Sequence, residues 1–337
     1  MPYFFLMVYN AQDVDRKVFS ILRVLGNSRD ALGARVIARS LKDFGVELGE
    51  RAVRYHLKLT DERGLTRLVG RRDGRVITDL GQAELKKALV TDKVGFALSR
   101  IESLTFRTTF DMDKRTGMVP VNIAFFPKDS FSKALKIMKP VFAAGICVSD
   151  LVASAEEGEI IGELLVPKGN IALATVCSIL VNAALLKAGI PVDSRFGGIL
   201  QMQNKKPLRF TELINYAGSS LDPTEIFIRA NMTSVSDVVK SGDGEILANF
   251  REIPAICRPR AEEVSAKLRA AGLGGILQIG SVSEPVCEIH LDLNRVGIIL
   301  IGGLNPVAAA REAGVAAESH AMSALIDYQK LVKVTDL

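Results

Sequence analysis

The 337-residue sequence contains no tryptophan, only three histidines and only four cysteines, and these scarcities limit the chemistry that the chain can perform. The cysteines are Cys147, Cys177, Cys257 and Cys287. None belongs to a Cys-x-x-Cys pair and each lies in or beside an apolar stretch, so we expect buried free thiols instead of disulfides. The histidines, His56, His290 and His320, are scattered, whereas a zinc site needs several converging ligands. We therefore predict no structural metal.

The sequence also lacks an apolar run long enough to cross a bilayer. Residues 1–9, MPYFFLMVY, are apolar, but they are too short for a membrane span or for the apolar region of a signal peptide. They also lack a basic start. We expect a cytoplasmic protein without membrane contact, in which these residues form a strand or a packing arm, or precede a true start at Met7.

Motifs that mark common enzyme classes are missing as well. There is no Walker phosphate loop, and the glycine-rich segment 272–275 follows a predicted helix instead of joining a strand to a helix, so it is not a dinucleotide fingerprint. No Ser/His/Asp arrangement can be recognised. The length suffices for two or three domains with proper cores, and 48% hydrophobic and 24% charged residues are typical of a globular protein. These observations disfavour an enzyme.

The segment from residue 34 to residue 78 has the pattern of a winged helix-turn-helix. Apolar residues recur at helical spacing over residues 13–26 and again over residues 34–44, where Gly45 can end the second helix. A turn of four residues, 46–49, then precedes a third helix that begins near Glu50. Short helices joined by so tight a turn form the core of a helix-turn-helix.

The third helix carries two unlike faces. Val53 and Leu57 point to one side, with His56 beside them, which predicts a packed inner face. The opposite side is basic and is formed by Arg51, Arg54, Tyr55 and Lys58. Arg and Lys can meet guanine edges or phosphates when a helix enters the major groove, so we predict that this face binds DNA.

A basic hairpin follows the third helix. Its predicted strands, 65–69 and 76–77, flank a glycine-bounded tip that carries Arg71, Arg72 and Arg75, and such a tip can reach phosphates or a neighbouring groove. Charge runs are commonly just solvated faces. Here, however, residues 11–90 hold 17 Lys/Arg and 11 Asp/Glu (net +6), and residues 91–337 hold 26 and 27 (net −1). Because the basic excess lies in the small head, we favour nucleic-acid binding.

The remaining residues predict a larger mixed α/β domain. We place the winged helix-turn-helix in residues 1–90 and an effector-binding and dimerisation domain in residues 91–337. Two related α/β units over residues 118–200 and 210–330 are suggested by a repeated order of strands and helices that end in Ala-Gly. Strand runs that are apolar throughout indicate that helices cover both faces of part of the sheet.

Two predicted loops of this domain could hold an anion. The loop 191–198 supplies Ser194, Arg195, Gly197 and Gly198, and the loop 302–306 supplies Asn305 ahead of a helix. An Arg fork beside free backbone amides at a helix N-terminus suits a small dicarboxylate or a phosphate. The alternative is structural: glycine pairs also mark turns, and a loop arginine can pair with a neighbouring carboxylate.

Three segments of the large domain carry a resemblance to a known family. They are PVDSRFGGIL (191–200), LDPTEIFI (221–228) and GGLNPVAAAREAGV (302–315). With the winged helix before them, the sequence resembles the NrpR nitrogen-regulation repressors of methanogenic archaea over about residues 13–330. The resemblance implies a homodimer on an inverted-repeat operator at nitrogen-assimilation promoters, with 2-oxoglutarate as the inducer and no other cofactor. Some members carry two effector domains whereas this chain has room for one, so a partner subunit of the same family is a further expectation.

The sequence is therefore interpreted as a dimeric transcriptional repressor that 2-oxoglutarate releases from double-stranded DNA. Arg195 is predicted to clamp a carboxylate, Asn305 to add a polar contact, and the remaining donors to be Ser194, Gly197 and Gly198. Three alternatives stay open: an enzyme for a small organic acid with an attached DNA-binding head, a repressor that answers another small molecule, and a constitutive architectural DNA binder.

Overall fold

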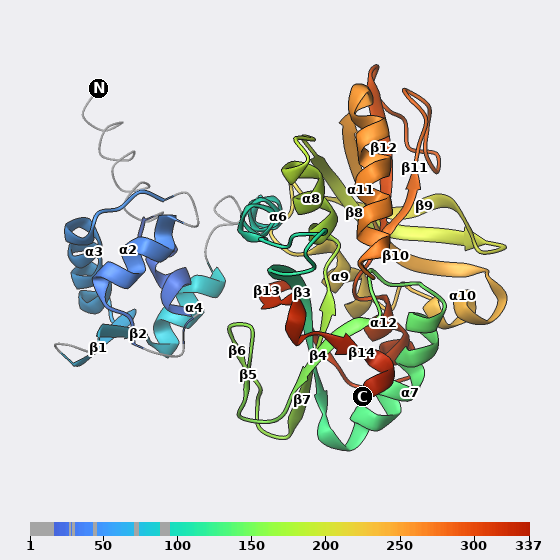
Figure 1. The fold of residues 1–337 in the computed structure, drawn as a ribbon. Coiled ribbons are helices and arrows are strands. Elements are labelled where there is room, and N and C mark those ends of the chain that lie inside the picture. The colour runs from blue at the N-terminus through green and yellow to red at the C-terminus, as the bar shows by residue number, and fades with distance from the viewer. Residues whose placement is uncertain (1–16, 27, 29–30, 43–45, 71–73, 88–94) are drawn as a thin grey trace. The chain divides into compact units, whose positions relative to one another are not determined.

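The computed structural model describes residues 17–26, 28, 31–42, 46–70, 74–87 and 95–337 (Figure 1). The chain divides into two compact units, residues 1–94 and residues 95–337. The boundary expected from the sequence lies after residue 90, and the division in the structure lies between residues 94 and 95. The predicted arm over residues 1–9 and the wing arginines Arg71 and Arg72 lie outside the described residues.

The first unit is a winged helix. Its elements are a helix over residues 17–26, α2 (Ala34–Lys42), α3 (Glu50–Glu62), β1 (Thr66–Gly70), β2 (Gly74–Ile77) and α4 (Asp79–Lys87). The hairpin β1–β2 is antiparallel, and Leu32 forms an antiparallel bridge with Arg75 that adds a third stretch of chain to this small sheet. Apolar residues at helical spacing fill the core between the helices, including Ile21, Leu25, Ile37, Leu41, Val53 and Leu57. The mixed α/β fold with an N-terminal winged helix confirms the predicted fold class.

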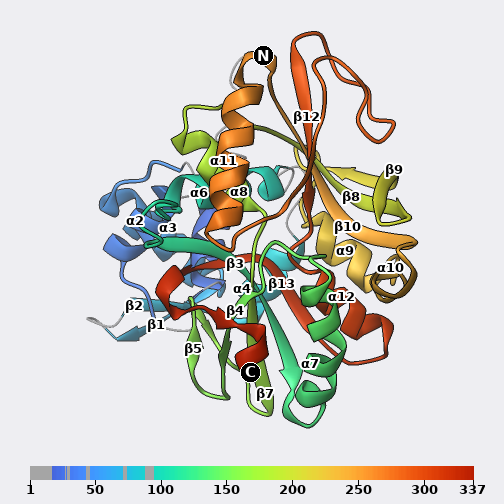
Figure 2. The same cartoon turned by 45° about the vertical axis from the view of Figure 1, so that its right-hand side comes forward.

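The strands of the second unit form two five-stranded antiparallel sheets (Figures 1 and 2). The first has the order β13-β3-β7-β4-β14, with bounds Glu318–Asp327, Met118–Pro127, Asn170–Val176, Leu151–Ala155 and Val332–Lys333. The second has the order β11-β12-β10-β8-β9, with bounds Ile276–Ile279, Arg295–Ile301, Gly244–Pro254, Asp193–Gln203 and Lys206–Asn215. A separate short hairpin consists of β5 (Ile160–Ile161) and β6 (Leu164–Leu165).

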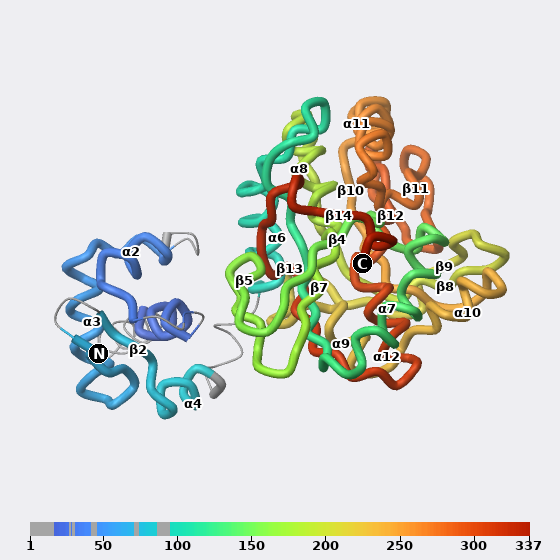
Figure 3. Tube along the Cα trace, turned by 60° about the horizontal axis from the view of Figure 1, so that its bottom comes forward, coloured from blue at the N-terminus to red at the C-terminus, as the bar shows by residue number. Residues whose placement is uncertain are grey.

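Helices join the two sheets into one body. They are α6 (Phe96–Arg107), α7 (Lys128–Ala143), α8 (Ile179–Lys187), α9 (Pro223–Arg229), α10 (Val235–Ser241), α11 (Arg258–Ala270) and α12 (Asn305–Glu312). Each of the two large hydrophobic cores takes residues from both sheets. Helix α8 is apolar except for Asn182 and Lys187, and residues 179–185 are all buried. The tube trace in Figure 3 follows the chain as it passes between the sheets.

The two sheets do not follow the sequence boundaries 118–200 and 210–330. The first sheet is completed by β13 and β14 from the C-terminal end of the chain, because β13 pairs with β3 from Met118 to Phe125. Strand β8, which was placed in the first unit, belongs to the second sheet, where it pairs with β9 and β10. The expectation failed because sequence order does not show which distant strand pairs with which.

The segment predicted as a loop over residues 191–198 is a strand from Asp193 onward. The glycine pair does not mark a turn there. A Cβ on Gly198 would lie 2.5 Å from the carbonyl oxygen of Glu212, and one on Gly197 would lie 3.0 Å from the Tyr216 hydroxyl. Glycine stands at both positions because neighbouring groups approach the strand closely, which is another common reason for glycine inside a sheet.

No helix within the described part of the chain is long and apolar enough to cross a membrane. Across those same residues, no three His, Cys, Asp or Glu side chains come together in a way that could hold a metal ion. All four cysteines are free thiols, with Cys147 and Cys177 buried and the other two partly buried.

Candidate functional site

Helix α3 presents the basic face that its sequence predicts. The residues Val53, His56, Leu57 and Thr60 are buried. The opposite side chains are exposed, namely Arg51, Arg54, Tyr55 and Lys58. Tyr55 is 61% exposed, although its ring also meets the edge of the His56 ring at a centroid distance of 5.4 Å. A large exposed aromatic side chain among basic side chains can contact the base edges or sugars of DNA.

The cations of this face are only weakly held by acidic neighbours. Arg54 pairs with Glu50, and Lys58 Nζ lies 3.8 Å from Glu62 Oε1, both one helical turn away. Exposed pairs of this kind contribute about 0.3–0.5 kcal/mol, so a phosphate can replace the carboxylate at little cost. Arg51 has no ion-pair partner among the described residues. The basic side chains of this face can therefore leave these carboxylates and bind DNA phosphates.

Arg75 differs from the other predicted DNA-binding residues because the protein itself uses its guanidinium. Its Nε donates to Asp61 Oδ2 at 2.7 Å, and the hydroxyl of Thr66 donates to Asp61 Oδ1 at 2.6 Å. The Arg75 and Asp61 side chains are only 22% and 27% exposed. This cluster ties the base of the wing to the end of α3. We therefore propose a structural role for Arg75, and its predicted contact with DNA stays a prediction.

The residues predicted to bind an effector on β8 have partners within the protein. Arg195 is half-exposed, and its guanidinium lies 3.4 Å from carboxylate oxygens of both Asp193 and Glu252. The Ser194 hydroxyl is buried and accepts a hydrogen bond from Asn182 Nδ2 at 2.9 Å. The backbones of Gly197 and Gly198 are paired with β10 on one side and β9 on the other. The structural alternative for this segment is therefore the better reading.

Asn305 also serves the fold. It is fully buried, accepts from the backbone N–H of Leu247 at 2.8 Å and donates to the carbonyl of Leu247 at 3.1 Å. These two bonds attach the start of α12 to β10, and they leave the amide group little capacity for a ligand. The predicted set Ser194, Arg195, Gly197, Gly198 and Asn305 is thus not brought together as one site.

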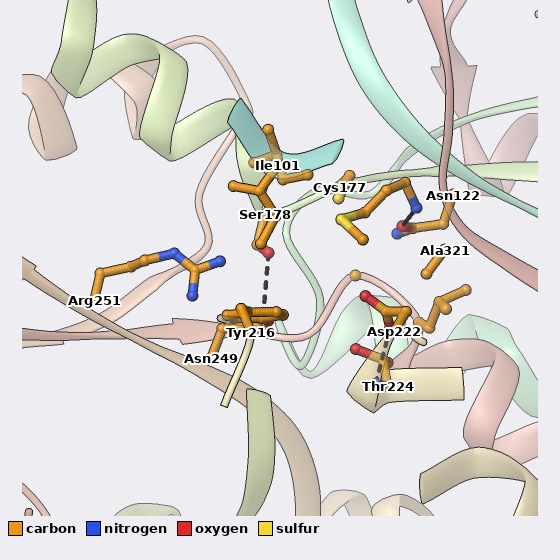
Figure 4. Close-up of a pocket in the computed structure, with 14 residues that line it drawn as sticks. Ile101, Asn122, Cys177, Ser178, Tyr216, Asp222, Thr224, Asn249, Arg251 and Ala321 are labelled. Atoms are coloured by element: carbon orange, nitrogen blue, oxygen red, sulfur yellow. Dashed lines mark hydrogen bonds between the residues drawn. The ribbon is translucent and has the colours of Figure 1, made fainter. Parts of the chain in front are cut away.

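A polar cavity lies elsewhere in the second unit, where β10, β13 and the beginnings of α8, α9 and α12 meet (Figure 4). It is a narrow, partly open hollow, and the 320 Å³ of space in and around it includes open solvent. Its polar lining is formed by Asn122, Ser178, Tyr216, Asp222, Thr224, Asn249 and Arg251. Small-ligand sites combine such a hollow with a few convergent polar groups, so this cavity is the best candidate for a ligand site in the described residues.

Arg251 is the feature that defines the cavity chemically. It is 1% exposed, yet no carboxylate among the described residues lies within ion-pair distance of its guanidinium. Its Nε donates to Asn182 Oδ1 at 3.2 Å, its Nη1 donates to the carbonyl of Phe250 at 3.0 Å, and it lies 5.0 Å from the centre of the Tyr216 ring. A buried charge without an opposite charge is costly, by about 3–5 kcal/mol in mutational terms. An anionic ligand would supply the missing charge.

Two helix N-termini strengthen this preference for an anion. Ser178 precedes α8 and Leu304 precedes α12, neither start is capped by its own side chain, and both residues line the cavity. The positive end of each helix dipole favours negative charge there. The backbone N–H groups of Leu180, Val181 and Asn305 already donate within the chain. Gly303 permits the close approach of α12, because a Cβ there would lie 2.4 Å from the Val176 carbonyl oxygen.

A neutral hydrogen-bond network completes the wall beside Arg251. The Tyr216 hydroxyl donates to Asn249 Oδ1 at 2.5 Å, and Asn249 Nδ2 donates to the Ser178 hydroxyl at 3.2 Å. Burial raises the pKa of Tyr216, so the phenol stays protonated at neutral pH. The network fixes side chains around the guanidinium without neutralising its charge.

Asp222 lies on the other side of the cavity from Arg251 in Figure 4. Its Oδ1 accepts from the backbone N–H groups of Thr224 at 2.8 Å and Glu225 at 3.3 Å, so it is the N-cap of α9. Burial and, after it, the nearby Glu225 carboxylate raise the pKa of this carboxyl to about 6. The cavity therefore has one basic and one acidic end.

The last wall connects the cavity to α6. The register between β13 and β3 breaks between His320 and Ala324, and Met322 in this bulge has a φ of 51°. Arg100 of α6 donates from Nε to the Met322 carbonyl at 2.7 Å, and Ile101 of α6 lines the cavity. β-Bulges often bend a strand and redirect its side chains next to functional sites. Because α6 is the first helix after the linker, this wall is the part of the site nearest in sequence to the winged helix.

Sequence reasoning missed Arg251 and its neighbours, although a signal was present. Asn249, Arg251 and Glu252 interrupt the apolar stretch 246–253, and the alternate positions of Asn249 and Arg251 put these two on one face of a strand. A charged residue in an otherwise buried strand needs a partner or a ligand. Of the two predicted anion loops, only 302–306 contributes to the cavity, through Gly303 and Leu304.

Comparison with known proteins agrees with both units. Residues 94–333 match the family model for NrpR regulatory domains NRD1 and 2, and residues 19–85 match that for the Ribonuclease R winged-helix domain. The Global nitrogen regulator NrpRI of Methanosarcina mazei is 41% identical over 321 residues, which cover 95% of this chain and 98% of that protein.

Two further relatives are longer. The Global nitrogen regulator NrpR proteins of Methanococcus maripaludis and Methanocaldococcus jannaschii are 33% and 34% identical, and the matches cover 55% and 56% of their lengths. Among solved structures, a nitrogen repressor-like protein from Methanococcus jannaschii matches with a TM-score of 0.61 and 29% identity, over 71% of this chain and 98% of that chain.

Proposed function

Because the chain belongs to the NrpR family and is a nitrogen-regulating transcription regulator, we propose that it represses nitrogen-assimilation genes and is released from its operator by 2-oxoglutarate. Its curated relatives are regulators and not enzymes, so its ligand is sensed and not consumed. The observation that carries the effector proposal is the buried Arg251 guanidinium, which lacks a carboxylate partner among the described residues and lines the polar cavity.

The chemistry of the cavity suits a small dicarboxylate. A guanidinium can bind one carboxylate through two parallel hydrogen bonds. The positive ends of the α8 and α12 helix dipoles lie at the cavity and favour a second carboxylate or a keto oxygen there. Ser178, Asn249 and Tyr216 supply neutral hydrogen-bonding groups between them. 2-Oxoglutarate has two carboxylates and one keto group, which these donors can satisfy together.

DNA binding is assigned to the basic face of α3 and to the wing. Arg51, Arg54, Tyr55 and Lys58 are exposed on one helix face, and the first unit holds the basic excess of the chain. A single winged helix reads only a short half-site, so two heads on an inverted repeat supply the specificity that one cannot. We therefore propose that the protein acts as a homodimer on double-stranded DNA.

Helix α6 is the element that we propose couples the two functions. It contributes Ile101 to the cavity and holds the β13 bulge through Arg100, and its N-terminal end follows the linker to the winged helix. A ligand that moves this helix shifts the preferred spacing of two heads in a dimer. By linkage, operator DNA must then weaken effector binding by the same factor by which effector weakens DNA binding.

A partner subunit of the same family is also proposed. The two longer relatives have nearly half of their length beyond the matched region. A separate chain that carries a second regulatory domain would be the counterpart of the part of those relatives that lies beyond the match. Co-purification with such a chain, encoded in the same genome, would support the proposal, and full operator regulation by this protein alone would contradict it.

The effector proposal is tested by a gel shift on the upstream region of the protein's own gene, with and without 2-oxoglutarate. The variants Arg251→Gln and Arg251→Lys remove the guanidinium fork, whereas Arg195→Ala removes an exposed arginine from outside the cavity. We expect wild type and Arg195→Ala to be released, and both Arg251 variants to bind the operator but to resist release. Thermal melts verify that each variant is folded.

Two results would contradict the proposal. Release of a folded Arg251→Lys protein at the wild-type concentration of 2-oxoglutarate would place the ligand outside this cavity. Wild-type protein that binds the operator equally well at every effector concentration would instead point to another small molecule or to constitutive binding.

A further inference from the structure

The acidic end of the cavity raises a question of ligand selection. Asp222 and Arg251 both act electrostatically on Tyr216 and on Cys177, so the two charged groups flank the same small space. Neither group has an ion-pair partner of opposite charge among the described residues. A ligand that fills the cavity meets a cation at one end and a carboxyl group at the other.

The surroundings of Asp222 offer it no positive counterpart. On its own helix α9 the nearest titratable group is Glu225, another acid. From the α8 side comes Cys177, whose pKa burial raises to about 11, and from the β9 side comes the equally neutral Tyr216. Beyond Glu225 lie Arg229, Arg100 and Glu318, which act on Glu225 and not primarily on Asp222. Arg251 reaches the cavity from β10.

Two classes of ligand fit a cavity with one cation and one carboxyl group. A zwitterionic amino acid would place its ammonium against an ionised Asp222. A dicarboxylate requires that Asp222 carry a proton, because two carboxylates in a water-poor site repel each other strongly. Asp222 Oδ1 is occupied by two backbone N–H donors, and the remaining walls are the uncapped helix starts and Arg251. Arg251 is the one charged group on the rest of the described lining, and it suits a carboxylate, so we favour the dicarboxylate.

We propose that Asp222 is the specificity-determining residue of this site and that it holds the dicarboxylate as a protonated acid, so that each bound effector takes up one proton. The inference rests on the proposed function of the cavity. The proton comes from solvent and adds to the Asp222 carboxylate, and the new O–H donates a hydrogen bond to an effector oxygen. No covalent bond to the ligand forms or breaks.

The sign of the pH dependence follows from this proton uptake. The empty site has an Asp222 pKa of about 6, because burial disfavours the charged form, and the bound dianion raises that pKa further. Between these two pKa values the dissociation constant increases about tenfold for each unit that the pH rises. Below about pH 6 the carboxyl is already protonated and the dependence flattens.

The substitution Asp222→Asn tests the proposal without removing the helix cap. Asparagine has nearly the same shape, is also a favoured N-cap and is neutral at every pH. Asp193→Asn is the matched control, because it changes an exposed carboxylate that pairs with Arg195 outside the cavity. Titration calorimetry of the full chain with 2-oxoglutarate, in phosphate and in Tris at pH 7.5, measures the protons taken up per ligand bound.

We expect close to one proton per effector for wild type and for Asp193→Asn, and none for Asp222→Asn, which binds at least as tightly and independently of pH. Wild-type binding without proton uptake overturns the proposal. Glutamate binding to wild type but not to Asp222→Asn would also overturn it. In that case an ionised Asp222 would pair with the ammonium group of the ligand. Absence of 2-oxoglutarate binding to any folded protein is a different result, and it refutes the proposed function itself.

Discussion

At the scale of single residues, the cavity depends on one glycine that allows α12 to start beside β7. A Cβ on Gly303 would lie 2.4 Å from the Val176 carbonyl oxygen and 2.6 Å from Asn122 Nδ2. We expect Gly303→Ala to lower the free energy of unfolding by about 1–3 kcal/mol, as overpacking in a close-packed interior does. Gly218→Ala is the control, because nothing lies within 4 Å of its added Cβ. Equal melting temperatures for the two variants would contradict this packing argument.

Arg75 and Arg51 should respond differently to removal, although the sequence gives both as basic residues of the head. Arg75→Ala breaks the hydrogen bond to Asp61 and should cost about 1 kcal/mol of stability. Arg51→Ala should leave stability unchanged and weaken operator binding, because this exposed side chain has no ion-pair partner among the described residues. Thermal melts and gel shifts on both variants decide the point. A stable Arg75→Ala protein with weakened DNA binding would return Arg75 to the interface.

At the scale of elements, α6 carries the proposed coupling through one side chain. Arg100→Gln removes the bond to the Met322 carbonyl, so 2-oxoglutarate should still bind but should release the operator less effectively. Arg107→Gln, on the same helix, breaks only an exposed pair with Glu163 and serves as the control. Effector affinity by calorimetry and operator release by gel shift are measured side by side. If Arg100→Gln releases DNA as wild type does, the coupling does not run through this contact.

Elements with a local cause could be predicted, and contacts between distant strands could not. The inner face of α3 and its start at Glu50 follow from helical spacing, and the structure confirms both. The strand β8 was mistaken for a loop because glycine suggests a turn unless the close approach of Glu212 is known. Arg251 was visible as a charge in an apolar strand, but only the fold shows that the starts of α8 and α12 lie around the same cavity.

At the scale of the whole molecule, the second unit is the expected site of dimerisation. It has its own cores, and it exposes large apolar side chains that include Phe106, Ile256 and Leu293, which are 84%, 91% and 85% exposed. Exposed apolar side chains favour association where they gather into one patch. Residues 95–337 expressed alone should therefore form a dimer in light scattering. A monomer at every micromolar concentration, with the full chain dimeric, would move the interface to the first unit.

The central claim is that effector binding and operator binding weaken each other. Measuring both of these effects on the same protein tests the claim most directly. The affinity for 2-oxoglutarate is measured by calorimetry with and without saturating operator duplex, and the operator affinity is measured with and without saturating 2-oxoglutarate. The account predicts that both affinities fall by the same factor, because the coupling free energy is shared. An effector affinity that operator DNA leaves unchanged, while effector still releases DNA, would contradict the account.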